Sequence, residues 1–192
     1  MKIFEAAAYF FLIATVLTGF GCATEPASEP ETEPAEEAEV EERVSPHESV
    51  SATVGEANIT ITYGRPYKKG REIYGGLVPF DAVWRTGADE ATTLESDRDL
   101  MLGDLHVPAG KYALFTIPGE SSWTLIVNKV SDQWGAFSYA EAEDLGRAEM
   151  SVSALESMLE QLTISIEPGE GSNGTLKIDW DMTSATLPIV AH

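Results

Sequence analysis

The sequence predicts an all-β domain, an antiparallel β-sandwich or jelly-roll-like barrel with one short helix, preceded by a signal peptide and a disordered acidic tether. Two observations predict this fold class. Apolar and polar residues alternate with period 2 in several short segments after Ser49, and Pro-Gly and Asn-Gly breakers separate the later ones. Helical spacing occurs in only one short segment. Many short strands with almost no helix favour packed antiparallel layers or a closed barrel.

Residues 1–21 are predicted to be a lipoprotein signal peptide. Residues 6–21 carry no charge and are strongly apolar, but the stretch is short for a membrane span, which needs about 20 residues. It ends at Gly19-Phe20-Gly21-Cys22, which resembles a lipobox, where the cysteine is lipidated and becomes the mature N-terminus. Cys22 is the only cysteine, so no internal disulfide can form. The alternative is an ordinary secreted protein or an uncleaved anchor.

The following residues, 22–44, are predicted to be the lipidated cysteine and a disordered linker. Residues 23–44 contain nine Glu, three Pro and one Arg, with no aromatic residue. Such a segment cannot bury enough apolar surface to offset its ordering entropy. We expect a spacer that holds the domain off a membrane in the bacterial cell envelope; binding of a cation or partner by the Glu run is the alternative. Because Ala23 rather than Asp follows the cysteine, lipoprotein sorting signals indicate the outer membrane rather than the inner.

Composition excludes several classes of function. The chain has 12 Lys+Arg against 32 Asp+Glu, a net charge of -20, which argues against nucleic acid as a partner. One Cys and three His exclude Cys-rich or His-rich zinc sites, and we expect no metal and no cofactor. His47, His106 and His192 are interpreted as surface or terminal residues. No P-loop, G-x-S-x-G, H-E-x-x-H or EF-hand motif is present, so the sequence supplies no catalytic template.

The folded domain is expected to span 45–192. Its strands are predicted from alternation and β-rich composition over 50–54, 59–63, 111–117, 123–128, 162–166, 175–180 and 185–190. The turn-forming residues 118–121 join two of them. Residues 152–162 show helical spacing through Leu155, Met158, Leu159 and Leu162, which predicts the one short helix.

A basic window is the main candidate site. Residues 65–85 have a net charge of +3 within a domain of -12, and they contain five of its ten basic residues: Arg65, Lys68, Lys69, Arg71 and Arg85. Glycines and aromatic residues are dense in the same window. Clustered Arg in a Gly-rich loop beside aromatics suits a bidentate anion site or a sugar-stacking platform. Alternatively, Arg65 and Arg85 pair with acids such as Glu90 and staple a long loop.

Several ordered motifs resemble the DUF2911 family of bacterial secreted proteins and lipoproteins of unknown function. They are Tyr63-Gly-Arg-Pro66, Gly70-Arg-Glu-Ile-Tyr-Gly-Gly-Leu-Val-Pro79, residues 83–93 from Val83-Trp-Arg-Thr-Gly, residues 108–119 from Pro108-Ala-Gly-Lys-Tyr, residues 123–129 and Gln133-Trp-Gly-Ala136. The resemblance implies a compact, exported β-rich domain and supplies no reaction. The matching signature positions are Arg65, Arg71, Trp84, Arg85, Glu90, Lys111, Tyr112, Asn128, Lys129, Trp134 and Gly135.

Three functions remain open. The first is a lipid-anchored binding module for a small anionic or saccharide ligand, with Arg85, Arg65 and Lys111 as donors and Trp84 and Trp134 as flat apolar faces. The second is an envelope enzyme, a hydrolase or isomerase, with Glu90 as general base and Arg85 or Lys129 stabilising negative charge. The third is a purely structural envelope protein. Convergence of the signature residues in one concave pocket separates these alternatives.

Overall fold

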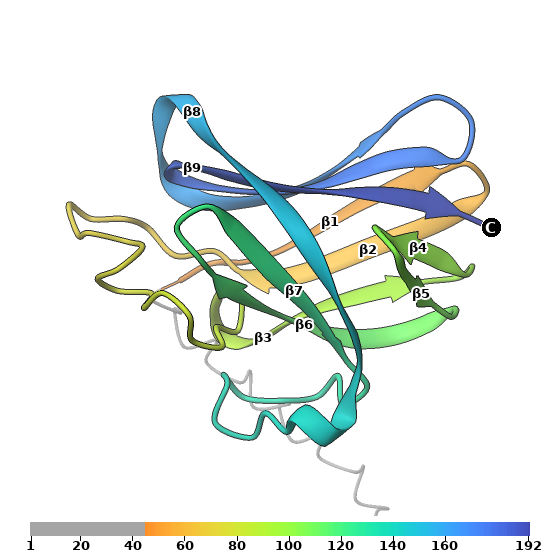
Figure 1. Cartoon of the computed structure of the whole chain (residues 1–192), viewed down its shortest axis with the longest axis horizontal. Helices are drawn as coiled ribbons and strands as arrows, with labels where there is room; N and C mark the ends of the chain where they lie inside the picture. Colours follow the sequence, from red (N-terminus) through yellow and green to blue (C-terminus); the bar gives the residue numbers. More distant parts are fainter. Residues whose placement is uncertain (1–44) are drawn as a thin grey trace, which may run out of the picture. The chain divides into compact units, whose positions relative to one another are not determined.

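The computed structural model describes residues 45–192; the predicted signal peptide, the 22–44 linker and Cys22 lie outside the described residues. Residues 45–192 form a nine-stranded antiparallel sheet and one short 3-10 turn, η1 (Glu141–Glu143) (Figure 1). The strands are β1 (His47–Val54), β2 (Ala57–Gly64), β3 (Ala88–Ser96), β4 (Leu100–Leu102), β5 (Leu105–Val107), β6 (Gly110–Pro118), β7 (Ser122–Asn128), β8 (Asp144–Pro168) and β9 (Asn173–Ala191). The predicted all-β class is confirmed.

The strands are ordered β1-β2-β3-β6-β7-β8-β9-β4-β5 across the sheet. Within 45–192, four pairs of consecutive strands form antiparallel hairpins with short turns: β1–β2, β4–β5, β6–β7 and β8–β9. Val54 pairs with Ala57 across a two-residue turn in which Gly55 has φ 58, a left-handed conformation that glycine adopts without steric cost. No helix within 45–192 has the length and apolar character needed to span a membrane.

The two longest strands, β8 and β9, turn the sheet into two layers. The first part of β8 pairs with β7, up to Ser151 opposite Ser122, while its last part leaves β7 and continues to pair with β9, up to Pro168 opposite Gly174. The β8–β9 hairpin also contacts β1, a strand at the edge of the sheet that is far from it in the strand order. Figure 1 shows these strands beside one another. The layers of the predicted sandwich therefore belong to one continuous sheet that curls over itself.

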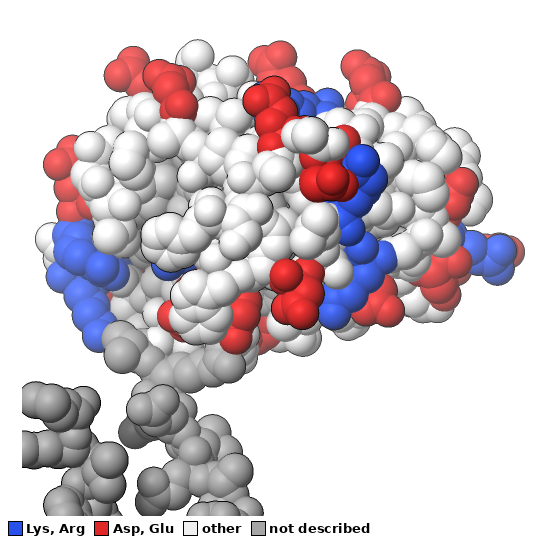
Figure 2. Space-filling model, turned by 90° about the horizontal axis from the view of Figure 1, so that it is seen from below, with Lys and Arg blue, Asp and Glu red and all other residues white. Residues whose placement is uncertain are grey.

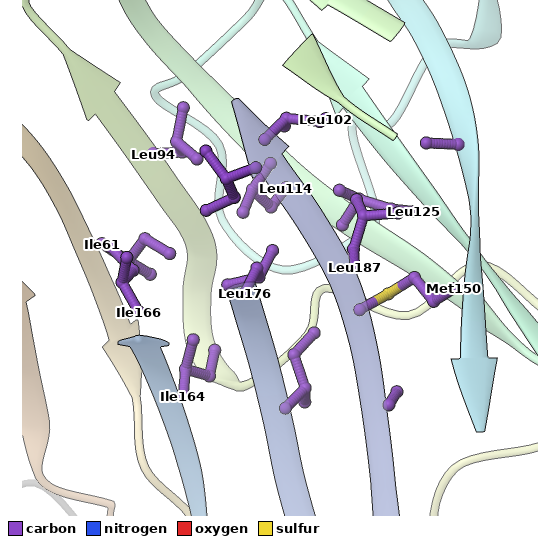
Figure 3. Close-up of a cluster of buried hydrophobic side chains, with 14 of the residues drawn as sticks. Ile61, Leu94, Leu102, Leu114, Leu125, Met150, Ile164, Ile166, Leu176 and Leu187 are labelled. Atoms are coloured by element: carbon purple, nitrogen blue, oxygen red, sulfur yellow. The ribbon is translucent and has the colours of Figure 1, made fainter. Parts of the chain in front are cut away.

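The core fills the space between these layers. Buried side chains of β2, β3, β6 and β7 meet those of β8 and β9 (Figure 3): Ile61, Leu94, Leu114 and Leu125 on one side, Ile164, Ile166, Leu176 and Leu187 on the other. Burying a side chain of this size contributes about 1.5–3 kcal/mol. A smaller cluster of Ala91, Ala113, Phe115 and Ile126 forms elsewhere, with Tyr139 of the β7–β8 loop packed against it.

The predicted helix at 152–162 is wrong, because these residues lie inside β8. The strand is bulged there: between Ala154 and Leu159 it advances five residues while its partner β9 advances two, from Thr183 to Asp181. Extra residues in a bulge break strict period-2 alternation. The apolar residues consequently recur every three or four positions, which is the spacing of a helix face. The predicted strand 162–166 is the end of β8, and the segments 175–180 and 185–190 both belong to β9.

Candidate functional site

The basic window lies in the long loop between β2 and β3, residues 65–87. Backbone hydrogen bonds hold this loop against the sheet. The Trp84 N–H donates to Thr116 O at 2.8 Å, the Thr116 N–H donates to Trp84 O at 2.9 Å, and the Lys68 N–H donates to Glu160 O at 2.6 Å. Figure 2, which views the molecule from below relative to Figure 1, shows a group of Lys and Arg side chains at its left edge. Figure 1 shows the β2–β3 loop on the same side. The loop therefore presents its charges from a fixed backbone.

Arg65 of this loop has a partner at each of its three guanidinium nitrogens. Its Nε donates to Leu162 O at 2.8 Å, its Nη2 donates to Thr163 Oγ1 at 3.0 Å, and its Nη1 lies 2.9 Å from Glu48 Oε2. These three partners belong to β8 and β1, so the guanidinium joins the two layers. The stapling role is the one that the structure gives to Arg65.

Two more cations of the window are also engaged. The Lys68 Nζ donates to Asp181 Oδ2 at 2.5 Å. The Arg71 guanidinium closes its own turn, donating from Nε to Lys68 O at 2.9 Å and from Nη2 to Tyr67 O. The remaining donors of Arg71 stay available at the surface, because the side chain is exposed.

Arg85 differs from these residues. Its Nε is buried and has no hydrogen-bond partner among residues 45–192, and its guanidinium makes no ion pair with a carboxylate there. Arg85 is followed by Thr86, a β-branched residue with φ 59, a conformation that bulky residues rarely adopt. The surrounding backbone holds it: Thr92 Oγ1 donates to Thr86 O at 2.9 Å, and the Thr92 N–H donates to Arg85 O at 3.2 Å. Such strain persists only where its surroundings over-determine the conformation, and it is typical of functional sites.

The Arg85 cavity, as we call it, has a volume of about 450 Å³. Lys69 and Arg71 line it together with Arg85, and Asp89 is the one acidic side chain among its lining residues. The rest of the lining is largely apolar: Pro66, Tyr67, Leu77, Val78, Trp84, Ala88 and Trp180. The cavity thus combines a cationic fork, whose buried Nε has no partner among the described residues, with largely apolar walls.

The rings of Trp84 and Trp180 belong to the wall of this cavity, and the rings of Tyr74 and Trp123 pack against Trp84. Trp84 stacks on Trp180 with ring centroids 6.1 Å apart and an interplanar angle of 17°. Tyr74 approaches Trp123 edge-on at 4.9 Å and also meets both stacked rings. Burial raises the pKa of the Tyr74 hydroxyl, as do the charges of Asp181 and the neighbouring Asp179. Because Trp84 is 9% exposed, it acts as a cavity wall rather than the open platform that the sequence suggested.

A second cavity of about 410 Å³, the Glu90 cavity, contains other signature residues. It is lined by His47, Thr62, Tyr63, Glu90, Ala91, Thr93, Lys111, Ser131, Asp132 and Gln133. His47 Nε2 lies 2.8 Å from Glu90 Oε2 and 3.9 Å from Asp89 Oδ2. Glu90 is therefore engaged with β1.

A bulge in β3 separates the two cavities. From Thr62 to Gly64, β2 advances two residues while β3 advances five, from Thr93 back to Ala88. The bulged residues leave β2 and pair instead with the β7–β8 loop, where the Ala91 N–H donates to Gln133 O at 2.9 Å. Bulges re-aim side chains beside binding sites. Here the bulge places Asp89 at one cavity and Glu90 at the other.

The comparisons place this domain in a family. The family model described as "Protein of unknown function (DUF2911)" matches residues 45–189, most of the chain. The chain belongs to the DUF2911 family. No curated protein and no solved structure matches it. The family assignment confirms the resemblance and leaves the chemistry to be argued from the geometry.

Asn128, one of the DUF2911 signature residues, is buried and serves the fold. Its Nδ2 donates to Ala140 O at 3.1 Å and to Asp144 Oδ1 at 3.0 Å. Its Oδ1 accepts from the Val130 N–H and from Gln133 Nε2, both at 3.1 Å. Asn128 therefore fixes the β7–β8 loop, whose residues 131–133 line the Glu90 cavity, and it lines neither cavity itself.

The other signature residues of the DUF2911 domain are dispersed. Lys129 lies 3.7 Å from Glu143 and lines neither cavity. Tyr112 packs against the main core, where burial and the charge of Asp99 raise the pKa of its hydroxyl. Trp134 is 59% exposed, opposite Glu90 in an isolated antiparallel bridge. The set does not converge on one pocket, and Arg85, Glu90 and Lys129, the catalytic set predicted for an enzyme, share no cavity.

The sequence analysis gave no site role to three contributors to the cavities of the DUF2911 domain, although one of them, Gln133, belongs to a family motif. His47 was interpreted as a surface residue, although strand pairing brings it to Glu90. Trp180 and Gln133 reach the cavities from β9 and the β7–β8 loop, far along the chain. No local signal identifies such residues. Within 45–192 no cluster of three or more His, Cys, Asp or Glu side chains could hold a metal ion.

Proposed function

We propose that this DUF2911 domain binds a small organic anion in the Arg85 cavity and that the chain is lipid-anchored through Cys22 in the bacterial cell envelope. One observation carries the binding proposal. Arg85 has a buried Nε without a hydrogen-bond partner among residues 45–192, while each guanidinium nitrogen of Arg65 has a partner.

An unpaired guanidinium beside a cavity favours an anionic ligand. Burying a polar N–H without an acceptor costs about 1–3 kcal/mol, and more when the group is charged. A carboxylate or phosphate that accepts two parallel hydrogen bonds from Arg85 removes this cost and gains a charge-assisted interaction. The unsatisfied N–H of Arg85 destabilises the protein without ligand, and an anion that accepts its hydrogen bond would remove this destabilisation.

The remaining lining residues define the ligand further. Lys69 and Arg71 add positive charge, and Asp89 opposes them with a single negative charge. Leu77 and Trp180 provide apolar surface that a simple inorganic ion would leave uncovered. A compact carboxylate or phosphate ester with an apolar body satisfies both requirements, since ligand pockets combine apolar walls with a few placed polar groups.

The anchoring proposal concerns where this binding takes place. The lipobox-like sequence before Cys22 and the acidic linker after it favour a domain tethered to a membrane, with the outer membrane expected from Ala23.

Thermal unfolding of the purified full chain tests the binding proposal. Benzoate and phenyl phosphate are the probes, and inorganic phosphate is the probe without an apolar body. A ligand at 100 times its Kd stabilises the folded state by about 2.7 kcal/mol, so we expect a saturable rise in Tm with the two organic anions. Arg85→Lys should abolish this rise, because Lys lacks the planar fork.

Arg98→Lys is the matched control, since Arg98 is exposed and lies 3.7 Å from Glu56, outside both cavities. It should respond to the anions as the unmodified protein does. The absence of any anion-dependent shift, or an equal shift in Arg85→Lys, would refute the proposal.

A further inference from the structure

We propose that the Glu90 cavity is a second binding site, which takes a neutral polyhydroxylated ligand of the saccharide class. This site is separate from the proposed anion site, because the lining residues of the two cavities do not overlap.

Gln133 carries the first step of the argument. It is 6% exposed, and its Nε2 donates to Val130 O at 2.6 Å and to Asn128 Oδ1 at 3.1 Å. Two oxygen acceptors around Nε2 fix the orientation of the amide. Its Oε1 is then buried without a donor among residues 45–192. An orphaned carbonyl oxygen on the lining of a cavity requires an O–H or N–H group from a ligand or water.

The other lining groups define what that donor belongs to. The carboxylates of Glu90 and Asp132 accept hydrogen bonds, Lys111 donates, and the Thr62 and Thr93 hydroxyls do either. Sugar hydroxyls both donate and accept, so they match such a mixed set. Lys111 faces two carboxylates, one of which also contacts His47, whereas three cations face one carboxylate in the Arg85 cavity. This balance favours a neutral ligand over an anion in the Glu90 cavity.

Trp134 is not a lining residue, but it is the bridge partner of the lining residue Glu90 and adds an aromatic surface next to it. It is paired with Glu90 in a bridge framed by the hydrogen bonds from Ala91 N–H to Gln133 O and from Gly135 N–H to Asp89 O. Residues opposite each other in such a non-hydrogen-bonded pair have their side chains on the same face and close together. The side chain of Trp134, which is 59% exposed, therefore leaves the backbone next to the side chain of Glu90. An exposed ring next to hydrogen-bonding groups suits the apolar face of a sugar.

Saturation-transfer NMR on the full chain tests this site with maltotriose, cellotriose and chitotriose as probes. We expect transfer to at least one trisaccharide, and a Kd weakened about tenfold in Trp134→Ala, which corresponds to about 1.4 kcal/mol of lost contact. Phe137→Ala is the matched control: Phe137 is the most exposed aromatic of the same loop, at 90%, and lines neither cavity. It should leave the Kd unchanged.

A second variant, Thr93→Val, removes a lining hydroxyl with little change of volume and should also weaken binding. Arg85→Lys should leave saccharide binding intact, and Trp134→Ala should leave the benzoate response intact, so the two proposals fail separately. No transfer to any of the three probes overturns the inference, as does equal weakening by Trp134→Ala and Phe137→Ala. Competition between benzoate and the saccharide would also overturn it.

Discussion

Comparing Arg65→Lys with Arg85→Lys tests whether Arg65 stabilises the fold while Arg85 is available to bind a ligand. Lys keeps the positive charge opposite Glu48 but cannot reproduce the planar fork. The substitution removes the hydrogen bond from Nε to Leu162 O, at 2.8 Å, and the one from Nη2 to Thr163 Oγ1, at 3.0 Å. Both acceptors belong to β8, and both bonds are partly buried.

The magnitude follows from these contacts. Leaving the Leu162 carbonyl without its side-chain donor costs about 1–3 kcal/mol, and losing the second hydrogen bond costs about 1 kcal/mol. The ion pair with Glu48 is worth less than about 1 kcal/mol, because the two side chains are 28% and 40% exposed, and Lys keeps part of it. We therefore expect Arg65→Lys to lower the free energy of unfolding by roughly 2–4 kcal/mol. The same substitution at Arg85 removes no hydrogen bond of Nε and should cost less than about 1 kcal/mol.

Denaturant unfolding of the unmodified protein and the two variants, followed by tryptophan fluorescence, measures both values. Trp84, Trp123 and Trp180 are all buried, so unfolding changes their surroundings. A stable Arg65→Lys protein, within about 0.5 kcal/mol of the unmodified one, would contradict the stapling role. An equally large loss at Arg85 would show that its guanidinium has a structural partner and would remove the basis of the anion site.

Three further predictions concern the backbone, the acid response and the anchor. Gly64→Ala should destabilise the domain by about 3 kcal/mol in denaturant unfolding, because its Cβ would lie 2.0 Å from the backbone oxygen of Ala88; a neutral result would contradict the close approach of β2 and β3. Hydrogen bonds from Asn58 lower the pKa of Asp97, so this carboxylate stabilises the fold above the ordinary pKa of 3.8 and loses its contribution as pH falls through the lowered value. Asp97→Asn should therefore be less stable than the unmodified protein at pH 7 and converge with it below pH 3.8; a constant difference across a pH series of unfolding midpoints would argue against this linkage. Cys22→Ser should move the protein from the membrane to the soluble fraction on cell fractionation, and retention of that variant with its apolar segment removed would exclude lipid anchoring.

The strands of this domain were predictable where one face is buried and the other is not. In β2 the alternating residues Ile59, Ile61 and Tyr63 are buried, as their period-2 pattern predicts. The pattern fails in β8, because bulges shift the register against β9 between Ala154 and Thr163. Bulged residues follow the demands of the curled sheet, a tertiary property that a short sequence window does not contain.

The candidate site was predictable in part. Charge and composition identified the loop that carries Arg85, and the family motifs identified Glu90. Neither could distinguish Arg65 from Arg85, because the partners that saturate Arg65 include Leu162 and Thr163, almost a hundred residues away. Which arginine is stapled depends on where β8 passes, and that is decided by packing.

The two cavities owe their difference to one short segment, residues 85–90. Thr86 and Asp89 have φ values of 59 and 61, and this left-handed conformation is unfavourable for a β-branched residue such as Thr86. Gly87 between them approaches the Gly64 backbone so closely that a Cβ would lie 2.8 Å from its oxygen. This segment turns away from β2, exposes the cationic side chain of Arg85 to one cavity and delivers Glu90 to the other. Hydrophobic packing alone would favour a regular strand there. The irregular backbone is instead held by hydrogen bonds to Thr92 and to the β7–β8 loop, so the fold accepts local strain to keep a cation and a carboxylate apart. Arg85 and Glu90 consequently line different cavities, which is the separation that the two proposed binding sites need.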